Sequence, residues 1–94
     1  MYKLRVSDDT KKLVRTMHPK LKQKVRDALK NILSDPSSGK GLKDEPAGLR
    51  SFRVSRFRII YRVSSKKEQI EIVAIGPRDR IYEETFRIVK KEMV

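Results

Sequence analysis

The chain has 94 residues and a mass of 11.0 kDa, the size of one domain, and it contains no Cys for a disulfide or a thiolate metal site. Its 24 Lys and Arg side chains against 12 Asp and Glu give a net charge of +12, which favours a polyanionic partner, nucleic acid or a ribosome, or else an acidic protein. No apolar stretch approaches the ~20 residues of a membrane span, and the N-terminus lacks the apolar run of a secretion signal. We therefore expect one cytoplasmic domain over residues 1–94, without membrane association.

The first half of the chain has the pattern of one strand followed by two helices. Residues 2–6 alternate apolar and basic side chains, which predicts a short strand, and Ser7 is placed to cap a helix that His18-Pro19 ends. Residues 20–33 repeat apolar side chains at helical spacing among many Lys, which predicts a second helix with one buried face. Turn-forming residues at 35–41 and a linker through Gly48 predict an ordered loop.

From residue 50 onward the apolar period changes to the two-residue period of strands. Residues 50–54 and 57–63 alternate apolar side chains with Arg, and a tight turn near Ser55 would join them as a hairpin. Residues 69–75 predict a third strand, which Gly76-Pro77 ends, and residues 79–93 predict a C-terminal helix. The order β-α-α-β-β-β-α indicates an α+β domain: a small, largely antiparallel four-stranded sheet with two N-terminal helices on one face, and a C-terminal helix expected on that same side.

Arginine gathers in the second half of the chain, where eight of the eleven Arg occur. If the apolar side chains of the hairpin face the helices, the opposite sheet face carries Arg53, Arg56, Arg58 and Arg62. Like charges directly across a hairpin destabilise it, so folding alone would not select this pattern. A solvated face and a phosphate-binding surface are both open interpretations, and the pair Arg78 and Arg80 follows the third strand, near an expected helix N-terminus that would also favour phosphate.

Two segments of the sequence resemble the RelE/ParE toxin superfamily of bacterial and archaeal toxin–antitoxin modules. They are residues 48–63 (GLRSFRVSRFRIIYRV) and 75–82 (IGPRDRIY), and the order of elements agrees over essentially the whole chain. RelE-branch toxins are endoribonucleases that cut mRNA in the ribosomal A site and so inhibit translation, whereas the ParE branch inhibits DNA gyrase and has no nuclease chemistry. The resemblance implies a toxin that an acidic antitoxin neutralises, with the RelE-like mRNA interferase as the first reading and the ParE-like gyrase inhibitor as the alternative.

The resemblance also implies which residues form the site. RNA cleavage in the RelE branch uses the 2′-hydroxyl as nucleophile, without a metal or other cofactor, and needs a base, an acid and positive charge at the phosphorane. The residues that match catalytic positions of the family are Arg53, Arg58, Arg78 and Tyr82. Further contacts to RNA or to the ribosome are expected from Arg50, Arg56, Arg62, Arg80, Lys40 and Lys43.

Two positions leave the chemistry open. RelE-branch members often carry a second Lys or Arg two residues before the position of Arg53, and this chain has Ser51 there. Arg is a poor proton acceptor because its guanidinium stays protonated, so the base is not identified, and a gyrase inhibitor or an RNA-binding module without catalysis stays an alternative. Tyr82 is either the C-terminal tyrosine of the family's site or a core residue that packs with Phe86.

Overall fold

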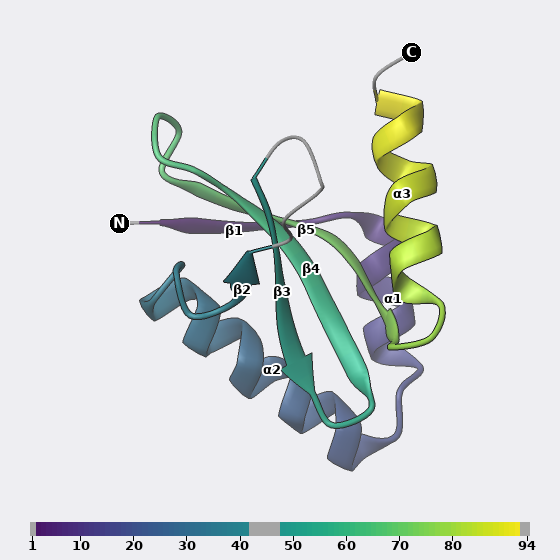
Figure 1. Cartoon of the computed structure of the whole chain (residues 1–94). Coiled ribbons are helices and arrows are strands. Elements are labelled where there is room, and N and C mark those ends of the chain that lie inside the picture. Colours follow the sequence, from purple (N-terminus) through teal and green to yellow (C-terminus); the bar gives the residue numbers. More distant parts are fainter. Residues whose placement is uncertain (1, 42–47, 93–94) are drawn as a thin grey trace.

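A computed structural model describes residues 2–41 and 48–92 of the chain (Figure 1). Its elements, in chain order, are β1 (Lys3–Val6), α1 (Asp8–Arg15), α2 (Pro19–Ser34), β2 (Lys40–Gly41), β3 (Leu49–Val54), β4 (Phe57–Ser64), β5 (Gln69–Pro77) and α3 (Ile81–Glu92). None of the helices in these two ranges is long and apolar enough to cross a membrane.

The strands form one sheet in the order β1-β5-β4-β3-β2. The β1–β5 pair is parallel and the three other pairs are antiparallel, which confirms the predicted α+β class and the largely antiparallel sheet. The sheet has five strands where the sequence predicted four, because β2 lies in the segment expected to be a loop. Two residues are too short a strand to show the alternation from which strands are predicted, and β2 is defined only by its pairing with β3.

The two N-terminal helices begin at residues that the sequence marks as helix starts. The Ser7 hydroxyl accepts a hydrogen bond from the Thr10 backbone N–H at 3.2 Å, and it donates to the Thr10 hydroxyl at 2.9 Å. Pro19 occupies the first turn of α2, where its missing N–H costs nothing, and His18 precedes it as the cap, with Nδ1 accepting from the Lys20 N–H at 3.3 Å. Each helix therefore starts at a residue that satisfies an otherwise unpaired backbone donor.

We expect the substitution Ser7→Ala to lower the free energy of unfolding by about 1 kcal/mol, because it removes the side-chain acceptor at the start of α1. The change should be read from urea or thermal unfolding. The control is Ser65→Ala in the turn between β4 and β5, where the serine is exposed and lies away from any helix start, so its loss should have a smaller effect. Equal losses for the two variants would contradict the capping role.

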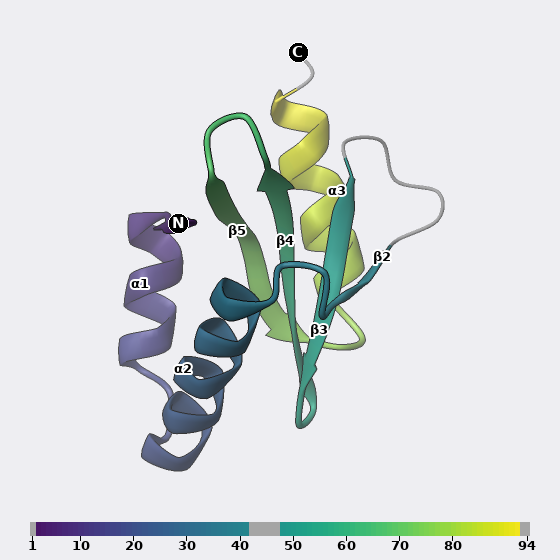
Figure 2. The ribbon, with the colours of Figure 1, turned by 90° about the vertical axis from the view of Figure 1, so that its left-hand side faces the viewer.

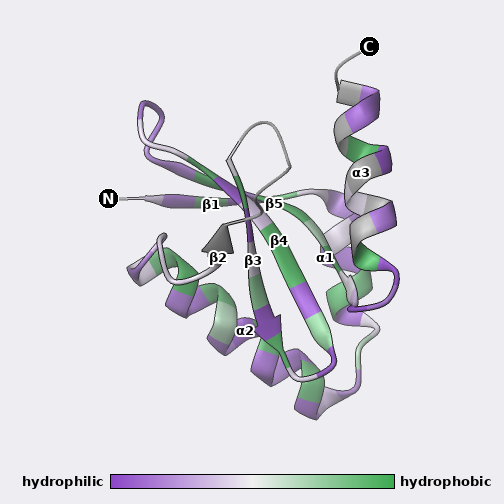
Figure 3. Ribbon diagram, in the orientation of Figure 1, coloured by the Kyte–Doolittle hydropathy of each residue, from purple (hydrophilic) through white to green (hydrophobic). Residues whose placement is uncertain are grey.

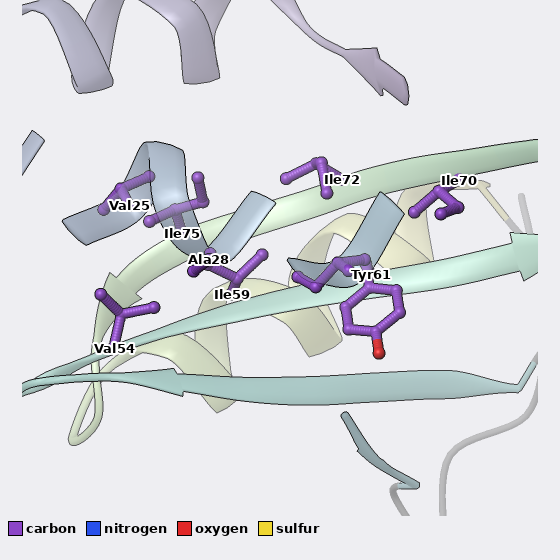
Figure 4. Packing of buried hydrophobic residues seen from close by; sticks show 9 residues of the cluster. Val25, Ala28, Val54, Ile59, Tyr61, Ile70, Ile72 and Ile75 are labelled. Carbon is purple, nitrogen blue, oxygen red and sulfur yellow. The ribbon is translucent and has the colours of Figure 1, made fainter. Parts of the chain in front are cut away.

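The main core lies between α2 and one face of the sheet. Figure 4 shows side chains of this cluster from close by, and its buried members are Val25, Ala28, Ile32, Val54, Ile59, Tyr61, Ile70, Ile72 and Ile75. Half-buried side chains of β1 and α1, including Leu4, Val6 and Val14, pack against its margin. The alternating apolar residues predicted for the hairpin therefore point toward the N-terminal helices, and the basic residues between them point away.

The C-terminal segment departs from the sequence-based expectation in its position. The helix α3 packs on the other face of the sheet, where Ile81 is fully buried together with Leu49, Ile60, Val73 and Ala74. Figure 2 shows α1 and α2 on one side of the sheet and α3 on the other. The expectation that all helices share one side is therefore wrong, and the sheet lies between two helical layers.

An irregularity in β5 explains how that strand serves both cores. Ile60 pairs with Ala74 and Tyr61 pairs with Ile72, so Val73 is an extra residue in the β4–β5 ladder. Val73 and Ala74 both join the smaller cluster under α3, whereas Ile72 and Ile75 join the main core. The run of apolar residues at the end of β5 thus reflects two covered faces.

A hydrogen-bonded brace holds the segment between α2 and β2. The Tyr61 hydroxyl donates to the Pro36 carbonyl at 2.9 Å and accepts from the Gly39 N–H at 2.8 Å. Arg50 lies opposite Tyr61 on β3, and its Nη1 donates to the Gly39 carbonyl at 2.7 Å. Tyr61 is fully buried, and Figure 4 shows its hydroxyl pointing out of the apolar cluster. The brace thus ties this segment to the centre of the sheet.

Candidate functional site

The β3–β4 hairpin places two predicted catalytic arginines directly across from each other. Arg53 on β3 is the register partner of Arg58 on β4, and both lie on the sheet face opposite α2. The hairpin closes through Ser55 and Arg56, with a φ of 58° at Ser55, the positive value that a type II′ turn requires at its first central residue. Because the turn fixes the register, it also fixes the pairing of the two like charges. Figure 3 shows hydrophilic bands at this end of β3 and β4.

Arg58 is more buried than the two other arginines predicted to be catalytic, Arg53 and Arg78, which are exposed. It is half-buried, its Nη1 donates to the Ser51 hydroxyl at 3.2 Å, and its Nε is buried without a hydrogen-bond partner in the described part of the chain. Its partner on β5 is Gly76, which has no side chain to cover this face. A buried donor without an acceptor costs about 1–3 kcal/mol, and the facing Arg53 adds repulsion. An anion bound here would relieve both costs.

A surface depression of about 560 Å³ lies where the hairpin turn meets the turn after β5. The backbone N–H of Arg78 donates to the Arg56 carbonyl at 3.1 Å and so joins the two turns. The residues that line the depression are Arg53, Ser55, Arg56, Phe57, Pro77, Arg78 and Asp79. The three arginine side chains in this lining are exposed. The fold therefore brings cations that are up to 25 positions apart in the sequence, from Arg53 to Arg78, to one depression.

Other predicted contact residues are engaged within the protein. Arg62 lies on the same face as Arg58 but pairs with Glu71 on β5, its Nε donating to Oε1 at 3.0 Å. Arg50 donates to the brace described above, at the other end of the hairpin. Arg80 is exposed in the turn that precedes α3. The structure thus separates Arg50 and Arg62 from the depression, and their contact with RNA stays a prediction.

Three predicted site residues fall wholly or partly outside the described residues. Lys43 lies in the segment that is not described, and for Lys40 and Tyr82 the description covers the backbone, in β2 and α3, but not the side chain. The choice between a catalytic and a core role for Tyr82 therefore stays open. The remaining cluster consists of Arg53, Arg56, Arg58 and Arg78, which we call the arginine cluster.

The geometry of the arginine cluster suits a phosphodiester. Arginine presents a planar set of N–H donors that matches two phosphate oxygens, and it keeps its charge at neutral pH. Arg58 is held by burial and by Ser51, whereas the three other members are exposed and can approach a ligand from the rim. The α3 helix begins three residues after Arg78, so its unpaired N–H groups lie at the same end of β5.

Two residues of this region were not predicted from the sequence. Ser51, considered as a departure from the family pattern, is 4% exposed and supplies the acceptor for Arg58. Asp79 lines the depression as the acidic residue among three arginines. A single acid between Arg78 and Arg80 was the available signal for Asp79, but only the folded turn shows that it faces the same depression as Arg53.

Comparison with known proteins places the chain in a family. A model of the ParE toxin of the type II toxin–antitoxin system parDE matches residues 1–82. A search of curated proteins finds no relative that matches significantly.

Solved structures share the fold at low identity. An arginine mutant of the Escherichia coli toxin RelE in the free state has a TM-score of 0.72 at 20% identity, covering 99% of this chain and 98% of its own. The RelE of the archaeal RelE–RelB complex from Pyrococcus horikoshii OT3 has a TM-score of 0.73 at 19% identity, covering 84% and 97%. The toxin–antitoxin complex RelBE2 from Mycobacterium tuberculosis gives 0.69 at 24% identity, covering 82% and 98%.

The family match covers most of the chain, and the RelE structures share its arrangement of helices and strands. The chain therefore belongs to the ParE toxin family of type II toxin–antitoxin systems, within the RelE/ParE superfamily, and it has the RelE fold.

Proposed function

We propose that this toxin is a RelE-like, ribosome-dependent mRNA endoribonuclease that acts in the cytoplasm. The observation that carries the proposal is the Arg53–Arg58 pair, which places two like charges across a hairpin beside a third arginine, Arg78. This arrangement is unfavourable for folding by itself and favourable once a phosphate is bound. Cleavage by a 2′-hydroxyl moves negative charge onto the phosphorane oxygens, which is where fixed cations lower the barrier most.

The proposed reaction needs positive charge at the phosphorane and two proton transfers. The 2′-oxygen forms a bond to phosphorus, the bond from phosphorus to the 5′-oxygen breaks, and the products are a 2′,3′-cyclic phosphate and a 5′-hydroxyl. Arg58 and Arg53 would bind the non-bridging oxygens, and Arg78 would bind from the rim of the depression. The proton of the 2′-hydroxyl goes to a base and the 5′-oxygen receives one from an acid. Tyr82 or a group of the ribosome would fill these roles.

An antitoxin partner is part of the same proposal. Several of the structures with this fold are complexes of RelE with the antitoxin RelB. The net charge of +12 favours an acidic segment, which would cover the arginine cluster in place of RNA. Antitoxin and mRNA would then exclude each other from one surface.

A second candidate is gyrase inhibition of the ParE type, and Ser51 is the observation that favours it. The Ser51 side chain is buried and serves Arg58, so it does not replace the basic residue that RelE-branch toxins often carry there. A toxin that needs no proton acceptor would tolerate this change. The family model that matches the chain is also that of a ParE toxin.

The two candidates predict different results with the purified toxin. In a reconstituted translation system, primer extension should reveal cuts within the A-site codon of ribosome-bound mRNA, and naked mRNA should stay intact. DNA supercoiling by purified gyrase should continue at the same toxin concentration. Inhibited supercoiling with intact mRNA would reject the nuclease and support the gyrase inhibitor.

A further inference from the structure

The depression beside the arginine cluster is lined by apolar residues as well as by arginines. Phe57 and Pro77 are register partners on β4 and β5, and both line the depression. The volume of about 560 Å³ lies in the range of small-ligand pockets. A phosphate would engage the arginines, and the lining also offers a phenylalanine and a proline, which are residues on which nucleobases stack.

Asp79 gives this depression a hydrogen-bond acceptor. It is exposed, it lines the depression with Phe57 and Pro77, and in the described part of the chain it has no hydrogen bond or ion pair. A carboxylate among arginines would weaken phosphate binding if phosphate were the whole ligand. Its presence is accounted for when it accepts hydrogen bonds from another part of the ligand.

We infer that the depression is a nucleobase subsite in which Asp79 selects guanine; the inference rests on the proposed function in taking RNA as the ligand. The Watson–Crick edge of guanine presents two adjacent donors, N1–H and the N2 amino group, which match the two oxygens of a carboxylate. Adenine and cytosine present one amino donor beside an acceptor, and uracil presents one imino donor between two carbonyls. A carboxylate, which only accepts, therefore favours guanine and opposes uracil most.

The geometry gives each residue around the base a separate role. Phe57 is half-buried and held by the main core, so its ring is fixed before the base arrives. Arg53, Arg56 and Arg78 surround the same space and would hold the phosphate attached to that nucleoside. The arginine side chains bind any nucleotide, and only Asp79 distinguishes one base from another.

Binding of mononucleotides to the isolated toxin tests the subsite without the ribosome. Guanosine 3′-monophosphate and uridine 3′-monophosphate should be titrated separately into labelled toxin, with the amide signals of residues 53–58 and 77–80 observed by NMR. We expect guanosine monophosphate to bind roughly tenfold more tightly, because a bidentate contact is worth about one factor of ten or more. Phe57→Leu keeps an apolar side chain but removes the ring, and it should weaken the binding of both nucleotides at least about fivefold.

The decisive variant is Asp79→Asn. The amide both donates and accepts, so the ratio of the two affinities should fall to near one, while uridine monophosphate binds as tightly as before or more tightly. Glu83→Gln removes the same charge at an exposed position early in α3 and should leave the ratio unchanged. Unchanged amide spectra away from the depression show that the variants are folded.

Equal affinities for the two nucleotides in the unaltered toxin, or an unchanged ratio in Asp79→Asn, would overturn the subsite. Loss of mRNA cleavage at every codon in Asp79→Asn, with an unchanged ratio, would also overturn it and would make Asp79 a proton acceptor instead. If the toxin cuts no mRNA but still prefers guanosine monophosphate through Asp79, the nuclease proposal fails and the subsite stands.

Discussion

In the nuclease proposed above, replacing Arg58 by Ala should lower the rate of mRNA cleavage in translating ribosomes by about a hundredfold or more, which is the usual cost of removing one preorganised charge from a transition state. Within the arginine cluster, Arg58 is the member that is half-buried, with a buried Nε and a hydrogen bond to Ser51. The measurement is the rate of appearance of cleaved mRNA by primer extension. The same change on exposed Arg26, in α2 on the opposite side of the sheet, should leave the rate within about twofold.

Stability separates a loss of charge from a loss of fold in this experiment. Arg58→Ala removes both a buried unpaired donor and a like-charge neighbour of Arg53, so we expect the free energy of unfolding to be unchanged or higher. Arg58→Lys keeps the charge but loses the planar set of donors, and it should retain part of the rate. A stable Arg58→Ala variant that cleaves at the normal rate would remove Arg58 from the mechanism.

The largest effect on stability is expected for the brace around Tyr61. Tyr61→Phe leaves the Gly39 N–H and the Pro36 carbonyl without their partner, which should cost about 2 kcal/mol and lower the melting temperature by roughly 10 °C. Thermal unfolding followed by circular dichroism gives the shift. Tyr2→Phe is the matched control, because Tyr2 is half-buried and the structure shows no hydrogen bond for its hydroxyl within the described ranges.

A substitution at Gly39 tests the same brace through the residue that contacts Tyr61. A side chain at Gly39 would lie 2.8 Å from the Tyr61 ring carbon Cε1 and closer still to its hydroxyl, so Gly39→Ala must displace a fully buried tyrosine. We expect a loss at least as large as that of Tyr61→Phe. If Gly39→Ala and Tyr61→Phe both left the melting temperature unchanged, the brace would have no role in stability.

The features best predicted from the sequence are those that depend on residues close together in the chain. The β3–β4 hairpin follows from its two-residue period and a short turn, and the alternation then places Arg53 and Arg58 on one face. The position of α3 could not be predicted in this way. Its apolar stripe shows that it packs on the sheet, but the extra residue Val73 makes β5 apolar on both faces, so neither side is excluded.

Contacts between distant segments account for the rest of what the sequence did not reveal. The hydrogen-bond partners of the Tyr61 hydroxyl lie 22 and 25 positions away, in a segment whose sequence predicts only a turn. Ser51 appears in the sequence as a missing base, and only the structure shows that its hydroxyl holds Arg58. Asp79 gains its proposed role only from the meeting of two turns at one depression.

The parallel pairing of β1 with β5 has a consequence for the timing of folding. Lys3 pairs with Gln69 and Val6 with Ile72, so β1, the first strand to be synthesised, can pair only after β5, the last strand, has been made. Closing so long a loop is slow compared with forming the hairpin. The end of β5 also carries Arg78 to the cluster, so the arginines meet only when nearly the whole chain has emerged. We therefore expect a nascent toxin to remain inactive on the ribosome that makes it.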